Sequence, residues 1–146
     1  MRARAHCDVP CGIYDTGPLI YHAVSVVRLM DQYHEASDAD FIKRARLVAQ
    51  KEEQAEKVKH EARVIWGDYF KADQIAKHPE IHELTHSIMQ TASKCKHEAH
   101  REDGERLVNL CNEFAEAFWD TKDVPTTKAP CPYPPNLAVV YPRLQG

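Results

Sequence analysis

Residues 105–122 have the sequence ERLVNLCNEFAEAFWDTK, and this segment decides the fold class. Its apolar residues recur every three or four positions, at Leu107, Leu110, Phe114 and Ala117. That spacing places them on one face of an α-helix. The segment is therefore predicted to be an amphipathic helix that buries one stripe against other helices.

Three earlier segments have the same periodicity and are predicted to be helices, at about Leu19–Tyr33, Phe41–Phe70 and Pro79–Lys96. Gly104 is expected to break the chain before the last helix. No segment alternates with a period of two, and Val139–Val140 is too short to form a sheet. Four amphipathic helices with short connections predict an all-α fold, an up-and-down four-helix bundle.

The composition changes after Lys122, because six of the nine prolines lie in residues 123–146. Proline at this density prevents helix formation and favours an extended, polyproline-like tail. Cys131 lies among these prolines and is expected to be exposed. The predicted organisation is a leader at 1–5, one domain at 6–122 and the Pro-rich tail.

Charge and cysteine content narrow the choice of partners and compartment. The chain has 19 Lys and Arg against 22 Asp and Glu, a net charge of −3, and no sustained basic run. Nucleic acid and acidic membranes are therefore excluded as natural partners. No apolar run reaches the roughly 18 residues that a membrane span needs. Five cysteines, an odd number, favour a reducing compartment, the cytoplasm, with thiols kept for metal or redox chemistry.

The densest chemistry lies in residues 6–14, HCDVPCGIY, which we call the hook. Cys7 and Cys11 could bind one metal ion, because Pro10 and Gly12 favour a turn around them. The spacing alone is also compatible with half of a zinc site or with an incidental pair.

The position of His6 favours a particular metal. If cleavage after Ala5 made His6 the first residue, its amine, the amide nitrogen of Cys7 and the Cys7 thiolate would form two fused chelate rings. Cys11 would complete a square of two nitrogen and two sulfur donors, and the His6 imidazole could be an axial fifth ligand. Such a set suits nickel in a one-electron redox site.

The hook, together with WGDYFK at 66–71, HPEIH at 78–82 and FWDTK at 118–122, resembles the nickel-containing superoxide dismutase family. The resemblance implies a four-helix bundle that assembles as a homo-hexamer, with one nickel ion per subunit. It implies a leader-processing protease that exposes His6. It also implies disproportionation of superoxide to dioxygen and hydrogen peroxide by Ni(III)/Ni(II) cycling.

The resemblance assigns roles to single residues of the hook. His6, Cys7 and Cys11 would be the nickel ligands and, together with Tyr14, the catalytic residues. Tyr14 would stand over the open face of the metal and screen what approaches it. Asp8 would anchor the hook against its own subunit or a neighbouring one.

Three further residues would support the site from the bundle. Tyr69 would be the hydroxyl neighbour of Tyr14. In the best-known members of the family a glutamate on the first helix and an arginine on the second hold the axial imidazole; the corresponding residues here are His22 and Gln54. A neutral pair could orient the ring of His6 but would polarise it less than a carboxylate does.

Two alternatives belong to other classes of protein. His82–His86, HELTH, matches the His-Glu-x-x-His pattern of zinc metalloproteases. A trimmed hook could also serve a nickel or copper carrier without enzyme activity. Cys95 and Cys111 lie on apolar helix stripes and are expected to pack in the core.

Overall fold

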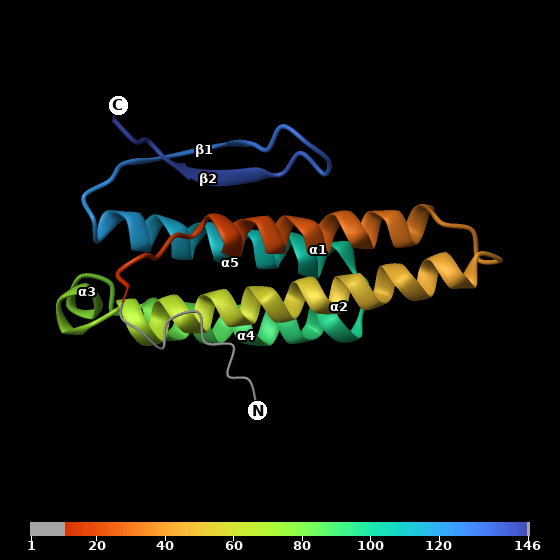
Figure 1. Cartoon of the computed structure of the whole chain (residues 1–146), viewed down its shortest axis with the longest axis horizontal. Coiled ribbons are helices and arrows are strands. Elements are labelled where there is room, and N and C mark those ends of the chain that lie inside the picture. The colour runs from red at the N-terminus through yellow and green to blue at the C-terminus, as the bar shows by residue number, and fades with distance from the viewer. Residues whose placement is uncertain (1–10, 146) are drawn as a thin grey trace.

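The computed structural model describes residues 11–145 of the chain. Within this range four long helices form the body of the molecule: α1 Gly17–Glu35, α2 Phe41–Val64, α4 Ile81–His97 and α5 Arg101–Asp120. They run alternately up and down, with α1 and α5 in one layer and α2 and α4 in the other (Figure 1). The predicted four-helix bundle is confirmed.

The apolar stripe of each helix forms the core between the two layers. Met30, Val58, Ile88 and Phe114, one from each long helix, are all fully buried. Burying these side chains supplies the main favourable free energy of the fold. Within residues 11–145, no helix is both long and apolar enough to cross a bilayer.

Gly104 lies inside a helix, so the prediction of a break there is wrong. Helix α5 begins at Arg101 and continues through the glycine. A Cβ atom at position 104 would lie 2.8 Å from Cγ2 of Val27 and 3.1 Å from Sδ of Met30. Glycine is therefore needed because α1 and α5 approach closely, and the helix tolerates its low propensity.

The predicted second helix does not continue as a regular α-helix to Phe70. Helix α2 ends at Val64 and is followed by η1 (Ile65–Tyr69), one turn of π-helix, and then by the short α3 (Ala72–Lys77). A π-turn inserts an extra residue and so changes which side chains face the core. Phe70 is buried in the core, whereas Tyr69 stays partly exposed.

The C-terminal segment forms a β-hairpin instead of a polyproline-like tail. Strand β1 (Thr126–Pro130) pairs antiparallel with β2 (Ala138–Pro142), and the hairpin lies along α5 and α1 (Figure 1). The prediction that Val139–Val140 is too short to form a sheet is wrong. Both valines are buried although they are neighbours, which explains why the sequence shows no alternation. Cys131, the first residue of the loop between β1 and β2, was predicted to be exposed but is 1% exposed.

Candidate metal centre

The base of the hook lies where α1 begins. Cys11 is exposed there, and Tyr14 is half-buried. The other predicted ligands, His6 and Cys7, and the predicted anchor Asp8 lie outside the described residues. The structure therefore shows the surface from which the chain leaves the bundle towards these ligands.

Tyr14 packs against Tyr69, with ring centroids 5.6 Å apart. The hydroxyl oxygen of Tyr69 lies 2.6 Å from Oγ1 of Thr121, which itself donates a hydrogen bond to the carbonyl of Phe118. Because a threonine hydroxyl carries a single hydrogen, Tyr69 is the donor to Thr121. The π-turn and the residues that follow α5 thus hold the ring of Tyr69 against Tyr14.

Residues of the FWDTK block complete this end of the bundle. Nε1 of Trp119 donates to Oγ1 of Thr16, 2.9 Å away in the interior, and so ties the start of α1 to α5. Nζ of Lys122 lies 4.8 Å from the centroid of the Tyr69 ring, at cation–π distance. The sequence pattern indicated this block. It did not indicate the partners of Thr121 and Trp119, which are Tyr69 and Thr16, because they lie far away in the chain.

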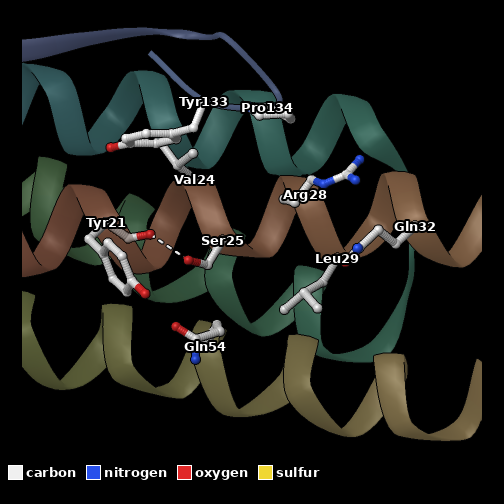
Figure 2. Close-up of a pocket in the computed structure, with 9 residues that line it drawn as sticks. All are labelled: Tyr21, Val24, Ser25, Arg28, Leu29, Gln32, Gln54, Tyr133 and Pro134. Atoms are coloured by element: carbon white, nitrogen blue, oxygen red, sulfur yellow. Dashed lines mark hydrogen bonds between the residues drawn. The ribbon is translucent and has the colours of Figure 1, made fainter. Parts of the chain in front are cut away.

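His22 and Gln54 face each other across α1 and α2. Nδ1 of His22 lies 2.7 Å from Oε1 of Gln54. A carbonyl oxygen only accepts, so with this orientation Nδ1 is the donor, and Nε2 of the neutral ring keeps a lone pair. Gln54 also borders a surface groove of about 270 Å³ between α1 and the hairpin loop (Figure 2).

Burial separates the described cysteines into one candidate ligand and three core residues. Burial raises the pKa of the Cys95 thiol to about 12 and that of the Cys111 thiol still further. Cys131 is buried and its thiol donates to the carbonyl of Tyr133. Metal ligation requires an accessible thiolate. Among the cysteines at 11–145, Cys11 alone has the exposure that nickel ligation by a hook requires.

The His82–His86 motif lies on the outer surface of α4. His82 accepts a hydrogen bond of 3.0 Å from Nε1 of Trp66. Within the described part of the chain, one group of three side chains could hold a metal ion, and it is formed by Glu98, His100 and Asp103. Neither histidine of the motif belongs to it, so the geometry does not favour a zinc protease.

Comparison with known proteins agrees with the geometry. Residues 1–122 match the family model described as nickel-containing superoxide dismutase. The nickel superoxide dismutase of Streptomyces coelicolor A3(2) is 34% identical over 118 residues, which are 81% of this chain and 88% of that protein. The Streptomyces seoulensis enzyme is 32% identical over 122 residues, covering 84% of this chain and 92% of its own.

Solved structures show the same similarity in three dimensions. The native structure of a nickel superoxide dismutase superimposes with a TM-score of 0.76 and 32% identity, covering 80% of this chain and 99% of its own. A crystal structure with nickel ligation of the oxidised state gives the same TM-score at 30% identity, covering 81% and 99%.

These findings define a helical-bundle metalloenzyme that is an oxidoreductase acting on superoxide. The chain belongs to the nickel-containing superoxide dismutase family. Nickel is its cofactor and superoxide its substrate.

Proposed function

We propose that this chain disproportionates superoxide at a nickel ion bound by its own hook, residues 6–14. The observation that carries the proposal is the exposed Cys11 three residues before Tyr14, which packs on Tyr69, in a chain that matches the family over residues 1–122. Bound nickel would supply the one-electron steps by alternating between Ni(III) and Ni(II).

The donor set of the hook suits that metal. His6 would contribute its terminal amine and its imidazole, Cys7 its amide nitrogen and thiolate, and Cys11 the second thiolate. Thiolates and a deprotonated amide are anionic donors that stabilise the higher oxidation state. The exposure of Cys11 is compatible with this role, whereas a buried thiol with a raised pKa would not be.

The reaction consumes protons, and the tyrosines would help to supply them through ordered water. Two superoxide ions and two protons give one dioxygen and one hydrogen peroxide. Tyr69 donates its proton to Thr121, so its oxygen keeps lone pairs that can accept from water and orient a proton-donating water at the site. Tyr14, which packs on Tyr69, would narrow the approach so that only a small anion enters.

The His22–Gln54 pair would orient the axial ligand. With Nδ1 of His22 bonded to Gln54, Nε2 can accept the N–H of the His6 imidazole. Neither side chain is a carboxylate, so the ring would be oriented without the negative charge that a carboxylate provides. Asp8 would anchor the hook against the protein.

Maturation and assembly belong to the same proposal. A protease would cleave after Ala5, because the nitrogen of His6 is a peptide amide until then and cannot be the amine ligand. The mature subunits would assemble as a homo-hexamer in the cytoplasm, where thiols stay reduced.

The test is intact-mass and metal analysis of the protein from cells supplied with nickel. We expect a chain beginning at His6, one nickel ion per subunit and superoxide dismutase activity. Cys11→Ser should lose nickel and activity, because an alkoxide replaces a thiolate poorly. Cys95→Ser is the matched control: on α4 the new hydroxyl can bond a carbonyl one turn earlier, and both properties should be retained.

Two outcomes would contradict the proposal. Full activity from nickel-loaded protein that still begins at Met1 would exclude the amine ligand. Stoichiometric nickel without superoxide turnover would instead indicate a nickel carrier.

A further inference from the structure

The β-hairpin, residues 126–142, is an addition to the part of the chain that matches known relatives. The family model matches residues 1–122. The native solved relative is covered to 99% of its own length while matching only 80% of this chain. Any role of the hairpin is therefore particular to this chain and to those that share the extension.

The hairpin is anchored to α5 by a buried side chain. Asn112 is completely buried, and its carboxamide makes two hydrogen bonds to β2. Nδ2 donates to the carbonyl of Ala138 at 2.9 Å, and Oδ1 accepts from the N–H of Val140 at 3.0 Å. One side chain thus satisfies two backbone groups that would otherwise lack partners at this contact. The hairpin is consequently part of the packed fold.

The same hairpin also lies against the first turns of α1. A small pocket of about 90 Å³ lies between Asp15–Gly17, Ile20 and Tyr21 on one side and β2 with Tyr133 on the other. Further along α1, the loop residues Tyr133 and Pro134 lie beside Val24 and Arg28 (Figure 2). Two parts of the hairpin therefore border α1 over its N-terminal half.

The start of α1 depends on such outside support. Thr16 occupies the N-cap position; its side chain makes no capping hydrogen bond, and its hydroxyl accepts from Nε1 of Trp119 on α5. The first turn of α1 contains no acidic residue to favour the helix dipole. Local support for the first turn consists of Pro18 and of the N–H of Gly17, which donates to Oδ1 of Asp15 at 2.6 Å. Tyr14 and the exposed Cys11 directly precede this turn, so the position of the turn determines where the base of the hook lies.

We infer that the C-terminal hairpin is a positioning element for the metal site: it holds the first turns of α1 and so fixes the base of the hook. This inference rests on the proposed function, because the hook is the ligand set. The hairpin contributes no ligand. It restricts where Cys11 can lie relative to the Tyr14–Tyr69 pair, and it thereby slows the loss of nickel.

Hydrogen exchange of the processed protein, with its hairpin intact, tests the inference in the presence and in the absence of nickel. Asn112→Ala removes the anchor of β2, and Val140→Ala is a milder variant in case the first folds poorly. The variant loses both hydrogen bonds to β2, and if about half of that loss reaches α1, exchange of the amides at 12–21 should become about five- to tenfold faster in metal-free protein. Nickel release to a chelator should accelerate by a similar factor.

Lys51→Met is the control, because the hydrogen bonds of Lys51 join α2 to the end of α4 and involve neither α1 nor the hairpin. It should leave exchange at 12–21 and the rate of nickel release unchanged. The inference is overturned if Asn112→Ala speeds exchange at 126–142 but not at 12–21, or if Lys51→Met has the same effect on 12–21. Hydrogen exchange of the metal-free protein tests the role of the hairpin whether or not nickel binds. A wild-type protein that binds no nickel would contradict the proposed function without affecting that test.

Discussion

Replacing Lys51 by methionine tests how α4 is held against α2. Lys51 is 3% exposed, and its ammonium group donates to three carbonyls at the end of α4. The acceptors are the carbonyl oxygens of Cys95 at 2.7 Å, Lys96 at 3.0 Å and Glu98 at 2.6 Å. The last carbonyls of a helix have no partner within it, so this lysine acts as a cap supplied by another helix. Methionine keeps the length of the aliphatic chain and removes the charge and the donors.

The expected loss follows from these three bonds. A hydrogen bond from a charged donor contributes about 1.5–3 kcal/mol net. The three bonds share one ammonium, and burial lowers the pKa of Lys51, which shows that the charge is desolvated at a cost. Glu98 is exposed, so water can reach part of the carbonyl cluster in the variant. We therefore expect unfolding to become easier by about 2–4 kcal/mol, a large part of typical domain stability.

Urea unfolding of the nickel-free protein at fixed concentration measures this free energy directly. Lys57→Met is the matched control, because Lys57 makes an exposed ion pair with Glu53 at 2.9 Å on the same helix as Lys51, α2. Exposed pairs contribute little, so the control should lie close to wild type. If Lys51→Met lowered the free energy of unfolding no more than the control does, water would satisfy the carbonyls of α4 as well as the lysine does. That result would refute the reasoning.

Three further predictions follow from single contacts. Gly104→Ala should lower the free energy of unfolding by about 1–2 kcal/mol, because crowding of Val27 outweighs the gain in helix propensity; an unchanged or raised urea midpoint would contradict this. For His78, burial lowers the pKa, but hydrogen bonds to Glu80 and Asp120 outweigh it and raise the pKa above 6.5 overall. Protonated His78 therefore stabilises the fold fully below about pH 6.5, and this stabilisation is lost as pH rises through the raised pKa. The thermal melting temperature of His78→Gln should consequently differ from that of wild type more at about pH 6 than at about pH 9. Gln54→Leu should release His22 and change the electron paramagnetic resonance spectrum of oxidised nickel, whereas Gln32→Leu, in the same groove, should leave the spectrum unchanged.

The bundle was predictable because helix formation and burial both follow a local period. The stripe that contains Phe114 repeats at helical spacing, and that spacing survives whatever the partners are. The helix ends were predicted less well. Gly104 is a breaker by propensity, yet the close approach of Val27 makes it the residue that fits inside α5.

The hairpin could not be predicted for a related reason. Strand prediction relies on alternation between a buried and an exposed face. Val139 and Val140 are both buried, and the hydrogen bonds that hold β2 come from Asn112 on a helix. The signal for this strand therefore lies on α5.

The chemistry of the metal site is a property of the sequence itself, because the proposed ligands are close together in the chain. The amine of His6, the amide and thiol of Cys7 and the thiol of Cys11 can form chelate rings through local covalent geometry, whatever the rest of the fold. The surroundings of the site were decided only by tertiary structure. Tyr69 reaches Tyr14 through a π-turn, and His22 meets Gln54 across two packed helices. Such contacts join residues far apart in sequence, and their geometry depends on how whole helices pack.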